Sequence, residues 1–139
     1  MDAESAQSVL LLESLASCNE QFISLAQWLS SVGHGDVSHS FNCRGYQSGT
    51  MLEVYVEVQL KGGVAICWWL DISWRHRHWL IDAAVLVNDD DGQRVLKQFS
   101  DRTPRTLQDF IVELKEATTD LVEYARSMDL EPATILGPM

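Results

Sequence analysis

Two neighbouring apolar runs, residues 64–74 and 79–87, constrain the fold more than any other part of this chain. Apolar residues occupy every even position of the first run and every odd position of the second. A period of two is typical of β-strands that bury one face. A two-residue turn at His76 and Arg77 would bring the two apolar sets onto one face, whereas a slip of one residue would set apolar against polar side chains throughout. The sequence therefore predicts a β-hairpin of defined register.

Two earlier segments extend this hairpin into a sheet. Residues 37–47 alternate loosely, and residues 51–60 alternate cleanly between apolar and polar side chains. Ser48-Gly49 and Lys61-Gly62-Gly63 are turn signals between the runs. After the fourth strand, Asn88 to Gly92 interrupts the sheet, and the spacing of Val95, Leu96 and Phe99 predicts a short helical turn. We therefore expect a four-stranded antiparallel meander.

Long amphipathic helices are predicted at both ends of the chain. An apolar stripe with steps of three and four runs from Leu11 to Val32 and ends at Gly33, a typical residue after a helix. Its width favours a helix lying on a sheet over a coiled coil. In the second helix, Thr103 would be the N-cap and Pro104 the first helical residue.

The expected fold class is α+β. The predicted order is α-β-β-β-β-α, a two-layer sandwich in which the long N- and C-terminal helices pack on one face of the meander. A length of 139 residues indicates one domain. We place this domain at residues 1–128, followed by a loose tail at 129–139 that contains two prolines and a glycine.

The charge narrows the classes of partner. The formal net charge is −10, which disfavours binding to nucleic acid and to anionic membranes and favours a basic protein partner. The three cysteines are odd in number and contain no CxxC pair, as expected for reduced thiols. The acidic N-terminus does not resemble a signal peptide, so the predicted location is cytoplasmic.

A candidate partner site lies on the sheet face that the helices leave uncovered. The predicted registers align Arg44, Glu53, Asp71 and Asp82 across the four strands. Directly opposed carboxylates destabilise a sheet unless something neutralises them. Aromatic and apolar side chains lie beside this row, so the predicted partner-binding residues are Glu53, Tyr55, Trp69, Asp71, Leu80 and Asp82. A heterologous partner, a second copy of the chain and an intramolecular segment are the three candidates to cover this face.

The familiar catalytic and metal motifs are absent, and no cofactor, metal or enzyme activity is predicted. The Asp89–Gly92 run fails as an EF-hand because Val87 and Gln98 would occupy the first and last ligand positions. His76 and His78 lack a third metal ligand, so a metal site is not predicted there. We interpret this segment instead as a basic turn that could contact a carboxylate or nucleotide weakly. On an open sheet face, we expect no raised pKa at the Asp71–Asp82 pair.

In size, acidity and α+β class, the chain is similar to secretion chaperones and to immunity proteins that neutralise basic toxins. This resemblance is compositional, and it implies a protein-binding module. Type III secretion chaperones usually interrupt the sheet with a helix after the third strand, whereas a tight turn is predicted here. The alternative is a small-ligand-binding protein or enzyme with its site between the first helix and the sheet, near His34, His39 and Tyr46.

Overall fold

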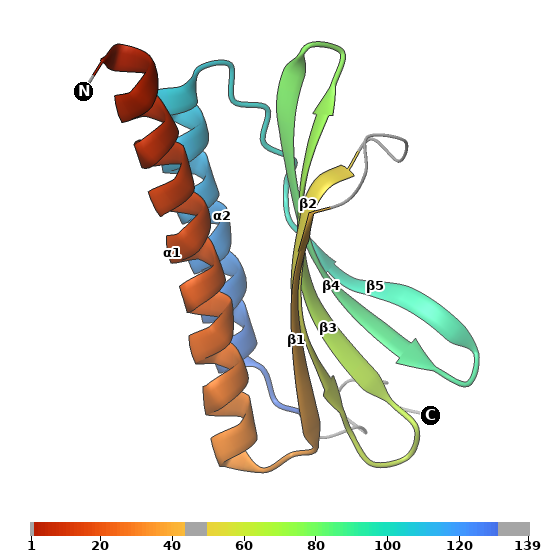
Figure 1. Ribbon diagram of the computed structural model, residues 1–139. Coiled ribbons are helices and arrows are strands. Elements are labelled where there is room, and N and C mark those ends of the chain that lie inside the picture. Colours follow the sequence, from red (N-terminus) through yellow and green to blue (C-terminus); the bar gives the residue numbers. More distant parts are fainter. Residues whose placement is uncertain (1, 44–49, 131–139) are drawn as a thin grey trace.

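The protein has two layers, a pair of helices and an antiparallel sheet (Figure 1). The computed structural model describes residues 2–43 and 50–130. Helices α1 (Ala3–Val32) and α2 (Leu107–Ser127) lie side by side on one face of the sheet. The strands follow chain order across the sheet: β1 (Asp36–Cys43), β2 (Thr50–Gln59), β3 (Ala65–Arg75), β4 (His78–Asp89) and β5 (Gly92–Gln98). The predicted α+β class, with both helices on one face, is confirmed.

The register of the central hairpin is the predicted one. Trp74 pairs with Trp79, and Asp71 pairs with Asp82, as the period-two pattern requires. The two turn residues, His76 and Arg77, have φ values of 52° and 68°. Positive φ at both central residues is the conformation of a type I′ turn, whose twist matches that of the strands.

A fifth strand replaces the short helical turn predicted around Val95, Leu96 and Phe99. The Asp91 N–H donates to Asp89 Oδ1 at 2.9 Å, and Gly92 has a φ of 114°, which a side chain would disfavour. This turn reverses the chain, so that β5 pairs with the exposed edge of β4. Strand pairing gives hydrogen-bond partners to the backbone N–H and C=O groups of the β4 edge. A helix would have left these groups unpaired, and this explains why the strand forms.

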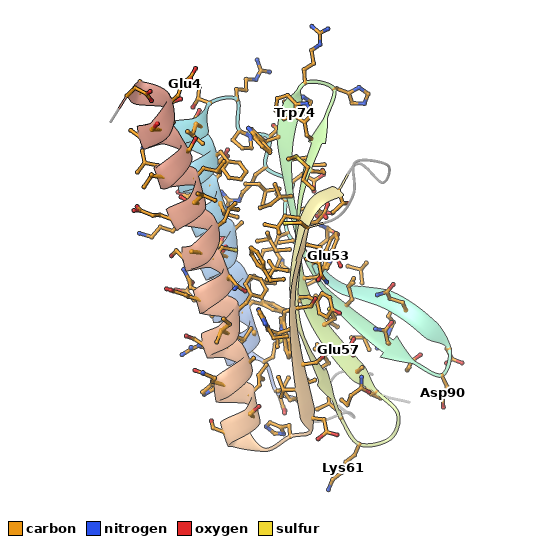
Figure 2. All side chains as sticks on the ribbon, in the orientation of Figure 1. Glu4, Glu53, Glu57, Lys61, Trp74 and Asp90 are labelled. Carbon is orange, nitrogen blue, oxygen red and sulfur yellow. The ribbon has the colours of Figure 1, made fainter. Side chains whose placement is uncertain are left out.

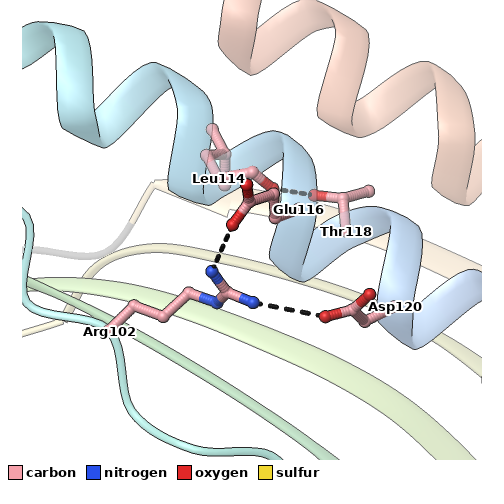
Figure 3. Close-up of polar contacts among 5 residues, drawn as sticks. All are labelled: Arg102, Leu114, Glu116, Thr118 and Asp120. Carbon is pink, nitrogen blue, oxygen red and sulfur yellow. Dashed lines mark hydrogen bonds and ion pairs between the residues drawn. The ribbon is translucent and has the colours of Figure 1, made fainter.

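Helix α2 also begins later than predicted. Thr106, rather than Thr103, is the N-cap, and its side chain accepts a hydrogen bond from the Asp109 N–H at 3.1 Å. The preceding segment cannot be helical because the backbone of Arg102 exchanges hydrogen bonds of 2.8 and 3.0 Å with Ile81 of β4. The Arg102 guanidinium then reaches α2 and contacts Glu116 and Asp120 at 2.8 and 3.2 Å (Figure 3).

The core fills the space between the helices and the helix-facing side of the sheet. Trp68 is fully buried, and its indole N–H points to Met128 Sδ at 3.4 Å. Trp74 was expected in the core but is 38% exposed. It lies on the hairpin near its tip and contacts Trp79 edge-on, with ring centroids 5.0 Å apart (Figure 2). Leu130, the last described residue, is buried, and residues 131–139 of the predicted tail lie outside the described residues.

Candidate functional site

An apolar groove of about 480 Å³ lies between the N-terminal half of α1 and the sheet. It occupies the end of the sandwich that carries the β3–β4 hairpin, where α1 and the sheet diverge (Figure 1). Groove volumes between about 300 and 1,000 Å³ are typical of ligand sites. The lining residues come from both layers: Leu11, Leu12, Leu15, Ala16 and Asn19 of α1, Phe41 and Cys43 of β1, Met51 and Leu52 of β2, Ile72 of β3, Trp79 of β4 and Phe110 of α2.

Side-chain size accounts for the open space. Further along α1, Phe22 and Leu25 are fully buried against the sheet. In the groove, the helix offers the smaller Ala16 and the polar Asn19 instead. Neither side chain supplies the apolar volume that Phe22 provides three residues after Asn19. The groove is therefore part of the same interface, left unfilled.

A β-bulge shapes the sheet side of the groove. Thr50 pairs with Ser73 and Leu52 with Ile72, so Met51 is an extra residue in β2. Strict alternation places Met51 on the outward face, but both Met51 and Leu52 line the groove. The expected orientation of Met51 is therefore wrong, because a bulge redirects the side chain at its position.

The rim of the groove exposes apolar side chains to solvent. Leu12 is 65% exposed and Met51 is 38% exposed, and both also line the groove. Val9, one turn before Leu12 on α1, is 39% exposed. Single exposed apolar residues are ordinary on protein surfaces, whereas a patch continuous with an apolar groove marks an interaction site.

Few polar groups enter the groove. Asn19 lines it, and Asn19 Oδ1 accepts a hydrogen bond from His39 Nε2 at 2.8 Å. Burial lowers the pKa of His39, which favours the neutral imidazole at neutral pH. The structure thus brings one residue of the predicted alternative site, His39, next to the groove. His34 is exposed beyond the end of α1, and Tyr46 lies outside the described residues.

Cys43 is the exposed thiol among the three cysteines, and it also lines the groove. Burial raises the pKa of Cys18 to about 11, although a hydrogen bond from Thr118 Oγ1 at 3.3 Å acts in the opposite direction. Burial, with a smaller effect of Glu57 and Glu53, raises the pKa of Cys67 to about 12. Both buried thiols are therefore unreactive at neutral pH, because the thiolate is the nucleophile.

On the outward face, the predicted residues come together in the expected register. Glu53 pairs with Asp71, Asp71 with Asp82, and Tyr55 with Trp69. Figure 2 shows Glu53 on the sheet side away from the helices. The indole N–H of Trp69 donates to Glu53 Oε2 at 2.9 Å. Asp71 is only 6% exposed, and the other five predicted residues, including Leu80, are half-buried. Arg44 lies outside the described residues.

Asp82 has a different environment from the one expected. Its pKa is raised, chiefly by burial and further by the nearby carboxylate of Asp101, while a hydrogen bond from Gln98 Nε2 at 2.7 Å opposes the shift. The expectation of an unshifted pKa on this face is therefore wrong for Asp82. Neither Gln98 nor Asp101 was recognised from the sequence, because both depend on the unexpected strand β5 and the segment that follows it.

The described residues contain no group of three or more His, Cys, Asp or Glu side chains placed to hold a metal ion. In the same described residues, neither helix is both long enough and apolar enough to cross a membrane. Comparisons of the chain with protein-family models, curated proteins and solved structures gave no match. Fold and geometry together define a small α+β sandwich with an open apolar groove at one end of its helix–sheet interface.

Proposed function

We propose that this protein binds another protein, and that the groove receives an amphipathic, basic segment of that partner. The supporting observation is an apolar groove of about 480 Å³ whose rim includes Leu12 at 65% exposure. A helix that places its apolar side chains into such a groove is a recurrent mode of recognition. This proposal keeps the protein-binding role expected from the sequence and moves its centre from the outward sheet face to the groove.

The exposed rim favours a macromolecular partner over a small ligand. A small-ligand site encloses most of its ligand's surface. Here Leu12 is 65% exposed at the rim, and Val9 extends the apolar surface along α1 beyond the groove, so an occupant confined to the groove would leave Val9 in water. A partner segment longer than the groove would cover both the groove and this extension.

Charge supports a basic partner. The chain carries 20 acidic and 10 Lys and Arg residues. On α1, the exposed Glu13 and Glu20 directly follow the groove-lining residues Leu12 and Asn19. Carboxylates beside an apolar contact surface steer basic partners toward it and select against acidic ones.

The outward face is the second proposed contact for the same partner. Trp69 is held by Glu53, with Tyr55 and Asp82 on neighbouring strands. Ordered aromatic side chains among carboxylates suit a basic surface. We expect Trp69→Ala to weaken partner binding and leave the domain folded; an unfolded Trp69→Ala protein would remove the support for this contact. The reduced state of the three cysteines fits a cytoplasmic location, which we also propose.

Binding can be tested with a neutral apolar dye and a model peptide. N-phenyl-1-naphthylamine fluoresces more strongly when it enters an apolar site. A helical peptide of about 14 leucine and lysine residues in amphipathic order should displace the dye, and a scrambled peptide of equal composition should not. Equal displacement by both peptides would mean that charge alone attracts them, which would contradict the groove proposal.

Matched surface variants locate the binding site. Leu12→Gln changes an exposed helical residue at the groove, and Val112→Gln changes one on α2 that is 45% exposed and does not line it. We expect Leu12→Gln to weaken peptide binding about five- to tenfold, the loss of roughly 1 kcal/mol or more of apolar contact. Val112→Gln should bind as the unmodified protein does, and equal losses in both variants would exclude this groove.

A small apolar ligand is the second candidate occupant, because the groove volume suits one. Saturable dye binding that the amphipathic peptide fails to displace would favour the small ligand. The remaining candidate occupant of the groove is a second copy of the chain. Light scattering over a concentration series detects such a dimer. A dimer that dissociates in Leu12→Gln but not in Val112→Gln would assign the groove to self-association.

A further inference from the structure

A second hollow, of about 390 Å³, lies at the tip of the β3–β4 hairpin. The described residues that line it are His76, Arg77, His78, Thr103 and Arg105. Each of these side chains can donate a hydrogen bond, and none of them is acidic. The described lining of the hollow therefore lacks negative side chains, in a chain that has 20 acidic residues and 10 Lys and Arg.

Two segments far apart in the sequence build this hollow. The hairpin tip supplies residues 76–78, and the connection into α2 supplies Thr103 and Arg105. The connection is held beside β4 by the backbone hydrogen bonds between Arg102 and Ile81. The guanidinium of Arg102 is paired with Glu116 and Asp120, whereas Arg77 and Arg105 form no ion pair with any described residue. Two arginines are thus available to an anion.

The backbone at the tip indicates that these side chains serve a purpose other than stability. His76 and Arg77 both have positive φ, at 52° and 68°. Asn-Gly is the preferred pair at such a turn, because glycine has no Cβ to clash in the left-handed conformation and the short polar side chain of asparagine tolerates it. Strained residues of this kind are concentrated at functional sites. The turn would be more stable without the histidine and the arginine.

We propose that this hollow binds the phosphate group of a small phosphorylated molecule. Arginine forks match phosphate oxygens, and donors on two separate segments suit a tetrahedral dianion better than a planar carboxylate. A phosphate group alone would fill only part of about 390 Å³, which leaves room for the remainder of a small molecule. The net charge of −10 disfavours long polyanions such as nucleic acid, so the ligand is compact.

Phenyl phosphate and the full chain labelled with ¹⁵N provide the test, with amide shifts followed by NMR. We expect saturable shifts centred on residues 76–78 and 103–105. Arg77→Gln and Arg105→Gln should each weaken binding about tenfold, as for the loss of a charged hydrogen bond. Lys61→Gln is the matched control, because it removes one positive charge at the opposite end of the sheet (Figure 2).

Three outcomes would overturn the proposal. The first is an absence of saturable shifts. The second is an equal loss of affinity in Lys61→Gln and Arg77→Gln, which would indicate general charge attraction. The third is tighter binding of benzoate than of phenyl phosphate, which would indicate a carboxylate site.

A double variant separates function from folding. His76→Asn with Arg77→Gly replaces the tip by the preferred turn residues. We expect the unfolding temperature to rise by a few degrees while phenyl phosphate binding is lost. Retained phosphate binding in this folded variant would contradict the proposal. Dye binding in the apolar groove should be unchanged, so this result is independent of the proposed protein-binding function.

Discussion

The two ends of the helix–sheet interface are both lined mainly by apolar residues, but they differ in packing. At the closed end, Phe22, Leu25 and Leu29 of α1 are fully buried, as are Val56 and Trp68 of the sheet. At the open end, Leu11, Leu15 and Trp79 are only partly buried and border a groove of about 480 Å³. One continuous apolar stripe on α1 supplies both ends. The difference shows that a protein can leave part of its own core surface available to another molecule.

Three local features produce this difference. The ribbon of α1 diverges from the sheet toward its N-terminus (Figure 1). Ala16 and Asn19 supply little apolar volume where the layers separate, and the bulge at Met51 turns one more apolar side chain toward the opening. We therefore regard the closed end as the stabilising half of the interface and the open end as the half that binds.

Thiol reactivity provides the largest expected contrast. In native protein at neutral pH, Cys43 should react with a maleimide at least about a thousandfold faster than Cys18 or Cys67, because the buried thiols must wait for unfolding. Mass spectrometry after timed labelling measures this ratio. Comparable rates at Cys43 and Cys18 would show that Cys18 is accessible in the folded protein, which would contradict its burial.

Core truncation should separate the two ends by several kcal/mol. Leu25→Ala is expected to lower the free energy of unfolding by about 2–5 kcal/mol, through lost burial and a new cavity. Leu12→Ala, at 65% exposure, should change it by less than about 0.5 kcal/mol. Urea unfolding followed by tryptophan fluorescence gives both values. A large loss in Leu12→Ala would assign a structural role to the open end.

Arg102 tests whether polar contacts also hold the two layers together. Its side chain is 25% exposed and contacts Glu116 and Asp120 on α2. Removing it in Arg102→Ala should reduce stability by about 1 kcal/mol, the upper range for a partly exposed ion pair. The loss should shrink in 1 M salt, because salt screens exposed charges. Arg126→Ala is the control, since Arg126 forms no ion pair with a described residue and its guanidinium carbon lies 5.7 Å from the centroid of the Trp28 ring.

The smallest expected effect is the contribution of Asp82, on the outward face, to the pH dependence of stability. Its pKa in the folded protein is raised above the ordinary value of 3.8, so the folded state holds this proton more tightly than the unfolded state does. Stability should therefore fall as the pH rises from about 4 through the raised pKa, and ionised Asp82 is unfavourable at neutral pH.

Asp82→Asn removes this ionisation while keeping a polar side chain of similar shape. It should be slightly more stable than the unmodified protein at pH 7, with little difference at pH 3.5. Thermal unfolding at both pH values tests this expectation. The opposite result would be an Asp82→Asn variant that is less stable than the unmodified protein at pH 7, with a smaller difference at pH 3.5. It would mean that the fold stabilises the ionised carboxylate.

The fold was largely predictable because the strands carry a strict period of two. That pattern determined the register of β2, β3 and β4, including the Asp71–Asp82 pair. Strand β5 was not predictable, since Val95, Leu96 and Phe99 fit a helix as well as a strand and the open edge of β4 decided between them. Thr103 resembles a helix cap in sequence, yet the bridge between Arg102 and Ile81 delays α2.

The groove was less accessible to sequence reasoning, because it depends on the angle between α1 and the sheet. One signal was present: Ala16 and Asn19 are small or polar residues on a helix face that is otherwise built from large apolar ones. The hollow at the hairpin tip was partly predictable from the sequence. His76, Arg77 and His78 were recognised as a basic turn, but Arg105 joins them only through tertiary structure.

Dye binding to the unmodified protein and to Ala16→Trp tests the central claim most directly. Ala16 lines the groove, so an indole at this position should fill it. We predict saturable binding of N-phenyl-1-naphthylamine by the unmodified protein. In Ala16→Trp, we predict at least a tenfold loss of affinity, about 1.4 kcal/mol, with an unfolding temperature that is unchanged or higher. Equal dye binding by both proteins, or none by either, would contradict the assignment of the open end as the binding site.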